Sequence, residues 1–252
     1  MANTDMFLTC GTYFDSGIDM YFVYRKPEPS VGTVSRVGTA RLEVSDSEFE
    51  AAAIDRLQKY APYKRILDLV LAPLCFVVLS PVYLTAAIAI FLEDGGPVHF
   101  VQERVGQNGT AFKCFKLRTM RIDAERGTGP QWARVNDPRV TKVGKVLRKT
   151  RMDELPQFFN VILGNMSLVG PRPMRMFFVE KISAVDPSYK LRLIAKPGMT
   201  GMSQLYTPAA DTVEDHLEKC AEDMKYMLQA NTFLDLKLIF KTVLDVISAR
   251  GR

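Results

Sequence analysis

The feature that most constrains this 252-residue chain is an almost uncharged segment, residues 66–92, whose single charged side chain is Asp68. A straight helix of this length, at about 1.5 Å per residue, would exceed the hydrocarbon core of a bilayer, which is about 30 Å thick. Ser80 and Pro81 stand near its middle, and a proline inside a helix removes a backbone donor and clashes with the preceding turn. The sequence therefore predicts a membrane helix that breaks at Ser80 and Pro81.

The flanks of this segment bear on its topology. Basic side chains precede it and acidic side chains follow it, namely Lys59, Lys64, Arg65, Glu93 and Asp94. Under the positive-inside tendency the N-terminal side faces the cytoplasm, and a straight span would export residues 93–252, which carry a net charge of +7. Such a basic domain suits the cytoplasm. We therefore expect a re-entrant helix-break-helix, in which Ser80 satisfies backbone groups that Pro81 frees, and an ordinary single-pass anchor is the alternative.

Composition sets looser limits on the fold. A chain of this length with 47% hydrophobic residues suits one sizeable domain with an appendage. No cleavable signal peptide is expected, because the apolar segment begins only at residue 66. The cysteines show neither paired spacing nor a Cys-X-X-Cys motif, which argues against a disulfide framework or a zinc site and fits a reducing compartment; they are Cys10, Cys75, Cys114 and Cys220.

The chain divides into three predicted parts. Residues 1–58 mix Gly, Ser, Thr and Pro without a sustained period and are expected to be a partly mobile extension, residues 59–93 are the membrane segment, and residues 94–252 form a cytoplasmic domain. The expected fold is α+β and mainly helical, with amphipathic interfacial helices. The expected strands span residues 98–103 and 111–117, and the expected helices span 45–60, 153–164, 211–229 and 233–248, with Ser45 or Asp46, and Asp211 with Glu214, at helix starts.

Positive charge is concentrated between residues 113 and 151, where 12 Lys and Arg stand against three Asp and Glu. This density attracts polyanions and suits anionic headgroups, prenyl phosphates or nucleotide diphosphates, whereas a solvated surface is the plainer reading. Nucleic acid is not an expected partner, because the interval holds only two aromatic residues, Phe115 and Trp132, and no known nucleic-acid module. The sequence therefore predicts a phosphate-handling surface.

Two adjacent carboxylates, Asp153 and Glu154, follow this basic interval and precede a Leu-Pro pair. Alone, such a pair would be read as a helix start, where Asp, Glu and Pro are favoured. After so many cations another reading is open, because a helix N-terminus offers N–H groups to phosphate, neighbouring Arg and Lys would keep Asp153 ionised, and an Asp carboxylate can attack phosphorus. Mg²⁺ prefers one or two carboxylates plus phosphate oxygens, so Asp153 and Glu154 are also candidate metal ligands.

A second constellation presents one arginine, Arg172, between Pro171 and Pro173. Proline fixes its own φ and restricts the residue before it, so the backbone around Arg172 is predicted to be stiff. A rigidly held guanidinium suits bidentate contacts to phosphate or a uracil-type base. The alternative is that Arg172 only anchors a loop. A third turn at residues 196–201 is a loop that could close over a ligand, or only a Pro-Gly turn.

Taken in order, these motifs resemble the bacterial sugar transferases of the small monotopic polyprenyl-phosphate phosphoglycosyl transferase family, which initiate exopolysaccharide and other glycoconjugate assembly. The resemblance covers about residues 63–246. It rests on Lys64-Arg65 before the apolar segment with Ser80-Pro81, on Gln102 and Arg104, on the motif at residues 115–120, on Asp153-Glu154-Leu155-Pro156-Gln157, on residues 159–161, 164–167 and 169–173, on Pro197-Gly198-Met199-Thr200-Gly201, and on Leu234-Asp235-Leu236-Lys237.

The resemblance implies a monotopic enzyme at the cytoplasmic face of the bacterial inner membrane, with a UDP-sugar donor, a polyprenyl (undecaprenyl) phosphate acceptor and Mg²⁺. By this resemblance Asp153 attacks the sugar-linked phosphate, UMP leaves, and the covalent phosphosugar then passes to the acceptor, with Glu154 assisting the metal or proton transfer. Asp153 and Glu154 would hold the metal. The implied substrate-binding residues are Lys116, Arg118, Arg151, Pro171, Arg172, Pro173 and Gln204.

The chain departs from the family pattern at two places and leaves other readings open. Residues 202–205 are Met-Ser-Gln-Leu where the family often has Trp-Ala-Gln-Val, and Lys196 stands where it has Arg. An inactive membrane-bound binding or scaffolding protein, and an enzyme that hydrolyses nucleotide-sugar pyrophosphate, are the alternatives to transfer. Self-association through hydrophobic surface is left open, and neither the donor sugar nor the acceptor length is predicted.

Overall fold

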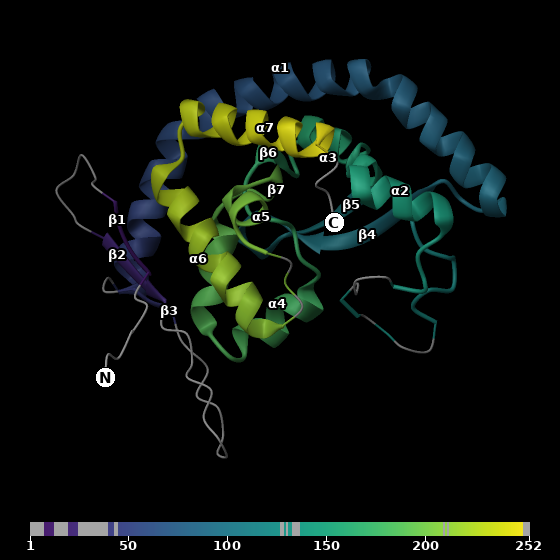
Figure 1. The fold of residues 1–252 in the computed structure, drawn as a ribbon. Helices are drawn as coiled ribbons and strands as arrows, with labels where there is room; N and C mark the ends of the chain where they lie inside the picture. The colour runs from purple at the N-terminus through teal and green to yellow at the C-terminus, as the bar shows by residue number, and fades with distance from the viewer. Residues whose placement is uncertain are drawn as a thin grey trace, which may run out of the picture.

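A computed structural model describes residues 8–12, 20–24, 40–42, 45–126, 129, 131–132, 137–208, 210 and 212–248. Within them the chain is mainly helical, with small sheets, as an α+β fold requires (Figure 1). The strands are β1 (Leu8–Thr12), β2 (Met20–Tyr24), β3 (Ala40–Leu42), β4 (His99–Val105), β5 (Ala111–Leu117), β6 (Ser167–Val169) and β7 (Gly198–Thr200). The α-helices are α1 (Asp46–Asp94), α2 (Lys142–Thr150), α3 (Gln157–Leu163), α4 (Met176–Ser183), α5 (Met202–Tyr206), α6 (Val213–Gln229) and α7 (Thr232–Ile247), and the 3₁₀-helices are η1 (Gln107–Gly109), η2 (Met152–Glu154) and η3 (Pro187–Ile194).

Helix α1 is a single element of 49 residues that joins the two helices expected from the sequence. It begins at a capping box formed by Ser45 and Glu48, as the pattern predicted, and ends at Gly95, whose positive φ of 65° suits glycine. The predicted break at Ser80 and Pro81 is wrong, because the helix runs through Pro81 without interruption and follows a curved path over the rest of the molecule (Figure 1). The Ser80 hydroxyl donates to the carbonyl of Val77 at 2.7 Å, which is the carbonyl that Pro81 cannot serve.

The hydrophobic core lies beneath this helix. Phe49, Ala53, Tyr60 and Ala72 of α1 join a large buried cluster with residues of α3, α4 and α6. Near its C-terminal end, Ala86 and Ile90 join a smaller cluster with Leu117 of β5 and Leu147 of α2. Both ends of α1 are therefore packed on one body, the arrangement that Figure 1 shows as a helix arching over the domain.

The strands form three separate small sheets. Strands β4 and β5 form the expected antiparallel hairpin, with Val105 opposite Ala111 across the short turn and His99 opposite Leu117. Strands β6 and β7 pair in parallel. Strands β1, β2 and β3 form an antiparallel sheet within the extension, and the rest of residues 1–44, where mobility was expected, lies outside the described residues.

Two expected helix starts are corrected. The basic interval holds a helix, α2, capped by the Thr141 side chain, and α3 begins only at Gln157, so Asp153 lies in a 3₁₀ turn and not at an α-helix N-terminus. The reason is Arg151, which adopts a left-handed conformation with φ of 57° and ends α2 before the carboxylate pair. Helix α6 is capped by Thr212 with Asp215 at its N3 position instead of Asp211 with Glu214, and Asp211 lies outside the described residues.

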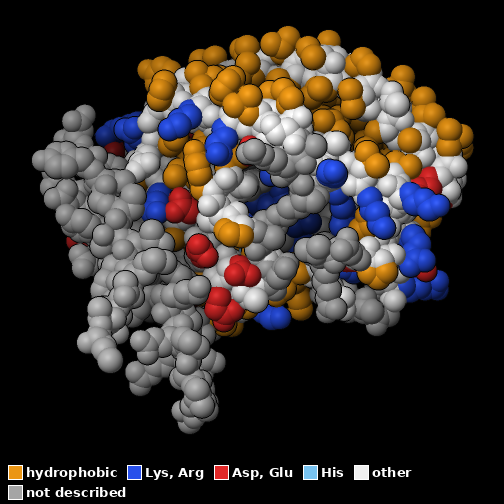
Figure 2. All heavy atoms as spheres, in the orientation of Figure 1, with side chains coloured by type: hydrophobic (Ala, Val, Ile, Leu, Met, Phe, Trp, Pro, Cys, Tyr) orange, Lys and Arg blue, Asp and Glu red, His pale blue; other side chains and the backbone are white. Residues whose placement is uncertain are grey.

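An apolar surface covers the outer side of α1 and α7. Helix α1 is long and apolar enough to cross a membrane. Figure 2 shows hydrophobic side chains spread over the crest of the molecule, with Lys and Arg side chains gathered beneath them. The exposed apolar residues on these two helices include Ile66, Val70, Leu74, Val77, Val78, Leu84, Ile88, Phe91, Leu92, Phe233, Phe240, Val243, Leu244 and Ile247.

Candidate active site

Asp153 lies in the short 3₁₀ turn η2 between α2 and α3. The turn forms because Arg151 reverses the chain after α2, and the amide of Glu154 then donates to the carbonyl of Arg151 at 3.2 Å. Asp153 is 8% exposed, and none of the hydrogen bonds among the described residues engages its carboxylate. A nearly buried carboxylate without a hydrogen-bond donor from the protein carries a desolvation cost, which makes Asp153 a candidate functional group.

Glu154, the next residue, is held by two cations. Lys116 Nζ donates to its Oε1 at 2.8 Å and Arg172 Nη2 donates to the same oxygen at 2.7 Å. Lys116 comes from β5 and Arg172 from the loop after β6, so three segments distant in the sequence converge on this carboxylate. The structure thus brings together four residues expected at the site, Lys116, Asp153, Glu154 and Arg172.

The surroundings shift the pKa values of the two neighbouring carboxyl groups in opposite directions. Burial works against ionisation of Glu154, but the charges of Arg172 and Lys116 outweigh it and hold the pKa of Glu154 far below its ordinary value. Burial raises the pKa of Asp153, and the negative Glu154 beside it adds to that rise, while Lys116 and Arg172 oppose it. Lys116, Arg172 and Arg148 act to lower the pKa of Asp153, as expected of nearby cations, but its burial outweighs them.

The loop that presents Arg172 is stiff because its carbonyls are held one by one. The amide of Gly198 donates to the carbonyl of Pro171 at 2.9 Å, and the side chain of Arg192 donates to that of Arg172 at 3.1 Å. The next two carbonyls, at residues 173 and 174, accept from the Arg104 side chain and from the Val105 amide. These hydrogen bonds add to the stiffness that the two prolines give the loop.

Gln204 joins the site from α5, where the sequence reads Met-Ser-Gln-Leu. Its Oε1 accepts from Arg172 Nη1 at 3.1 Å, so the two ends of the Arg172 guanidinium contact Gln204 and Glu154. The Nε2 atom of Gln204 is buried without a partner among the described residues. Arg172 itself is about half exposed, at 46%, and can reach a ligand from this position.

Two of the expected substrate-binding arginines have other contacts. Arg118 is buried and forms an ion pair with Asp94 at the end of α1, so its described hydrogen bond ties the membrane helix to β5. One of its nitrogens, Nη1, is buried without a partner among the described residues. Arg151 contributes its left-handed backbone to the turn before Asp153.

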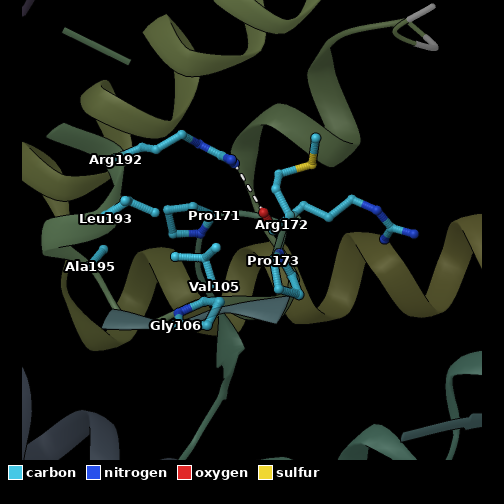
Figure 3. A pocket seen from close by; sticks show the side chains of 10 residues that line it. Val105, Gly106, Pro171, Arg172, Pro173, Arg192, Leu193 and Ala195 are labelled. Carbon is cyan, nitrogen blue, oxygen red and sulfur yellow. Dashed lines mark hydrogen bonds between the residues drawn. The ribbon is translucent and has the colours of Figure 1, made fainter. Parts of the chain in front are cut away.

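Pro171 and Pro173 line a pocket together with Arg172 and Arg192. Its other lining residues include Val105, Leu193 and Ala195, which are apolar. Figure 3 shows the Arg172 carbonyl facing Arg192 while the Arg172 side chain points away from Leu193 and Ala195. The pocket therefore borders the backbone of the loop that presents Arg172.

Sequence reasoning missed the buried arginines that support the site. Arg192 carries no motif signal, and Arg104 was only part of the family resemblance. Arg148 of α2 donates to the Thr119 hydroxyl at 2.9 Å, and its charge acts to lower the pKa of Asp153. A detectable signal lay in Asp223, an acidic residue one turn from the apolar positions of α6, because a carboxylate on a buried helix face requires a cationic partner.

The residues present fit a Mg²⁺ ion only in part. Asp153 and Glu154 supply two adjacent carboxylates, and Oε1 of Glu154 already accepts from Lys116 and Arg172. Within the described part of the chain no group of three or more His, Cys, Asp or Glu side chains could hold a metal. A cation here would therefore need further ligands from a substrate, which agrees with the way Mg²⁺ usually binds with phosphates.

Comparison with known proteins identifies relatives of this chain. A family model described as bacterial sugar transferase matches residues 59–249. Over 192 residues the chain is 41% identical to the UDP-N-acetylgalactosamine-undecaprenyl-phosphate N-acetylgalactosaminephosphotransferase of Aeromonas hydrophila, which covers 76% of this chain and 45% of the relative. Over 182 residues it is 41% identical to the UDP-glucose:undecaprenyl-phosphate glucose-1-phosphate transferase of Escherichia coli K12, covering 71% of this chain and 39% of the relative.

A relative of more similar length is known from Caulobacter vibrioides. It is a UDP-glucose:undecaprenyl-phosphate glucose-1-phosphate transferase, 41% identical over 187 residues that cover 73% of this chain and 70% of the relative. By contrast, the chain spans less than half the length of the Aeromonas and Escherichia proteins. The similarity falls on the region that contains α1 and the charged site.

Proposed function

Because the chain belongs to the bacterial sugar transferase family, we propose that it transfers a sugar phosphate from a UDP-sugar to polyprenyl phosphate at a membrane surface. The product is a polyprenyl diphosphosugar, the first membrane-bound unit of exopolysaccharide or glycoconjugate assembly. The observation that carries the proposal is the pairing of Asp153, buried and without a hydrogen-bond donor, with Glu154, which is clamped by Lys116 and Arg172.

The reaction runs in two displacements at phosphorus. The Asp153 carboxylate attacks the phosphorus that bears the sugar, the bond from that phosphorus to the bridging oxygen breaks, and UMP leaves with the bond electrons. An oxygen of the polyprenyl phosphate then attacks the same phosphorus, and the bond to Asp153 breaks to restore the carboxylate. Splitting the transfer in this way is the usual benefit of a covalent nucleophile.

The clamped Glu154 explains why Asp153 is suited to this role. Lys116 and Arg172 lie within hydrogen-bond distance of Glu154, the residue that follows Asp153 in the chain, and from there they can turn toward the phosphate oxygens. A carboxylate that lacks hydrogen-bond donors is a better nucleophile than one whose lone pairs are engaged. Preorganised cations that face developing negative charge are commonly the largest single contribution to such catalysis.

Asp153 and Glu154 would hold Mg²⁺ together with the donor phosphates, and the ion would neutralise charge on the pyrophosphate. Glu154 keeps a second carboxylate oxygen for this purpose, since the described hydrogen bonds reach only its Oε1. When a bound donor draws Arg172 and Lys116 toward its phosphates, the Glu154 carboxylate loses its two cationic partners and is free to bind a metal cation. The metal requirement is therefore expected to appear only with the donor.

The membrane topology is proposed to be monotopic and re-entrant, with both ends of α1 at the cytoplasmic face of the inner membrane. Arg65 donates to the carbonyls of Val161 and Ile162 at 2.7 and 2.8 Å, which ties the N-terminal half of α1 to α3. At the other end, Glu93 accepts from the amide of Lys142 at 2.7 Å. A helix bound at both ends to one domain cannot deliver its ends to opposite sides of a bilayer, which favours re-entry over a single-pass anchor.

The test of this function is the nucleotide that is released. Purified protein in lipid nanodiscs is incubated with Mg²⁺, undecaprenyl phosphate and a panel of UDP-sugars, and UMP is separated from UDP by chromatography. UMP release that depends on the acceptor, with formation of a prenyl diphosphosugar, is expected. UDP release indicates glycosyl transfer, acceptor-independent release of UMP and sugar phosphate indicates pyrophosphate hydrolysis, and no product from a folded sample indicates a scaffold; each of these contradicts the proposal.

A further inference from the structure

A closed ring of contacts holds Arg172 at both of its ends. Its carbonyl accepts from Arg192 Nη2 at 3.1 Å, and its Nη1 donates to Gln204 Oε1 at 3.1 Å (Figure 3 shows the first of these). The other half of the ring joins Arg192 back to Gln204. The whole path runs through η3, α6 and α5, none of which carries the carboxylate pair.

Asp223 of α6 closes this ring. Its Oδ2 accepts from Arg192 Nη2 at 2.6 Å and from Nε at 3.1 Å, and its Oδ1 accepts from the Ser203 hydroxyl at 2.6 Å. Ser203 precedes Gln204 in α5, so one peptide bond completes the circuit. Arg192, Asp223 and Ser203 are 4%, 1% and 1% exposed, which removes them from any direct contact with a substrate.

A buried ion pair of this kind contributes little net stability, because desolvation of both charges offsets their attraction. It does fix geometry, since in a poorly polarisable interior each hydrogen bond constrains its partners strongly. Two of these contacts end on Arg172, one through the backbone and one through the guanidinium. The arrangement accounts for how a half-exposed arginine keeps a single position beside Glu154.

We propose that Arg192, Asp223 and Ser203 are positioning residues that set where the Arg172 guanidinium meets the donor phosphates. The proposal rests on the proposed function, because it assigns these residues to the same phosphosugar transfer. Misplacement of a catalytic group by about 1 Å can reduce turnover by as much as about 100-fold. Loss of one contact in the ring is therefore expected to lower kcat/KM without removing any group that touches the substrate.

The test uses the smallest available change, Ser203→Ala, which removes one hydroxyl and leaves the Arg192–Asp223 ion pair intact. The expected loss is about tenfold in kcat/KM for UMP release, mainly in kcat. The matched control is Tyr226→Phe, which removes a buried hydroxyl of α6 that also donates to a carboxylate, that of Asp235 at 2.8 Å. Tyr226→Phe is expected to lower the thermal stability about as much as Ser203→Ala does, and to change kcat/KM by less than about twofold.

A double-mutant cycle separates positioning from general support. In an Arg172→Ala background, Ser203→Ala is expected to change kcat/KM by less than about twofold, because its effect passes through the missing side chain. An additive tenfold loss in that background, or an equal loss in Tyr226→Phe, overturns the proposal. Unchanged activity in Ser203→Ala alone overturns it as well.

A second readout does not depend on turnover. Amide hydrogen exchange in peptides that cover residues 170–178 is expected to speed up in Ser203→Ala and to stay unchanged in Tyr226→Phe. If the wild-type protein releases no UMP from any donor, the proposed function fails, whereas the exchange result still decides whether the ring holds the Arg172 loop. Unchanged exchange in Ser203→Ala contradicts the positioning role directly.

Discussion

At the residue scale, the surroundings of Asp153 and Glu154 give these two adjacent carboxylates different hydrogen bonds and different pKa values. Glu154 receives two cations on one oxygen, whereas Asp153 is buried and receives no hydrogen bond from the described residues. The pKa of Glu154 falls because Arg172 and Lys116 outweigh its burial, and the pKa of Asp153 rises mainly because of burial. Pairs of carboxylates whose environments shift their pKa values apart commonly divide two roles, and we propose an ion-pair anchor for Glu154 and a nucleophile for Asp153.

Glu154→Gln tests the role of the anchor. The substitution removes the charge that holds Lys116 and Arg172, so both cations lose their fixed position, and turnover is expected to fall by about 100-fold or more. Thermal stability should fall by only about 1 kcal/mol, since Arg172 remains partly solvated. The matched control is Glu103→Gln on the exposed side of β4, which should leave turnover unchanged. Wild-type turnover in Glu154→Gln would show that the anchor is dispensable.

Arg172→Lys tests the planar guanidinium, whose two terminal nitrogens contact Gln204 and Glu154 at the same time. A lysine keeps the charge but cannot place two donors in one plane, so kcat/KM is expected to fall by about 100-fold. Steady-state kinetics with saturating acceptor would measure it. Arg121→Lys, an exposed site in the same basic interval, serves as the comparison and should stay within about twofold. Equal behaviour of the two variants would reduce Arg172 to a source of positive charge.

At the scale of elements, α1 exposes apolar side chains on one side and is bound to the domain on the other. Lys64 and Arg65, which the sequence suggested as flanking topology signals, are instead engaged in the domain. Lys64 forms an ion pair with Asp235 at 2.6 Å, and Arg65 caps carbonyls at the end of α3. The C-terminal end is held through Asp94 and Arg118. The membrane helix is thus attached to the segments that follow and precede the carboxylate pair.

Ser80→Ala tests the hydroxyl that serves the carbonyl left free by Pro81. In a lipid environment no water replaces this donor, so the Val77 carbonyl loses its partner and the protein is expected to lose about 1 kcal/mol of stability. Unfolding in nanodiscs, followed by circular dichroism, would measure it. Ser47→Ala, at the exposed start of the same helix, is the control and should change stability by less than about 0.5 kcal/mol. Equal stability of Ser80→Ala and wild type would place Val77 in contact with water.

Sequence patterns located the elements that depend on local chemistry. The Ser45 cap, the hairpin of β4 and β5 and the final helix α7 were predicted from turn residues and periodicity. Of the residues that the family resemblance implied, Lys116 and Arg172 contact Glu154, and Gln204 contacts Arg172. The left-handed conformation of Arg151, which ends α2, was not predicted, because a positive φ at an arginine has no sequence signal.

The segment at residues 196–201 shows the same limit. The sequence predicts a turn there, but residues 198–200 form strand β7, and a Cβ on Gly198 would lie 2.0 Å from the Gly170 nitrogen. The glycine is required because β6 and β7 bring two backbones together at this point. Such a close approach becomes visible only once the partner segment is known.

At the scale of the whole molecule, the apolar crest and the basic surface beneath it suit a protein that we propose lies at a membrane surface. Figure 2 shows the two regions adjoining along α1. Because both halves of this helix are bound to the domain that holds the charged site, we propose that the site lies near the headgroup level. A lipid phosphate and a water-soluble nucleotide sugar can meet there.

Cysteine labelling tests this orientation. Single cysteines are introduced as Ser47→Cys and Lys142→Cys, which mark the start of α1 and the segment tied to its end. In intact cells both are expected to resist a membrane-impermeant maleimide and to react after permeabilisation, with the parent protein as the background. Labelling of one of the two sites in intact cells would indicate a single-pass anchor and exclude re-entry.

The most direct test of phosphosugar transfer through Asp153 is the mass of the protein after reaction with donor and Mg²⁺ in the absence of acceptor. Intact-protein mass spectrometry is expected to show an adduct of one phosphosugar on the wild-type chain, which peptide mapping places on Asp153 and which undecaprenyl phosphate discharges. Asp153→Asn is expected to give neither adduct nor turnover while staying bound to membranes. An adduct that persists in Asp153→Asn, or full turnover by that variant, would contradict the account.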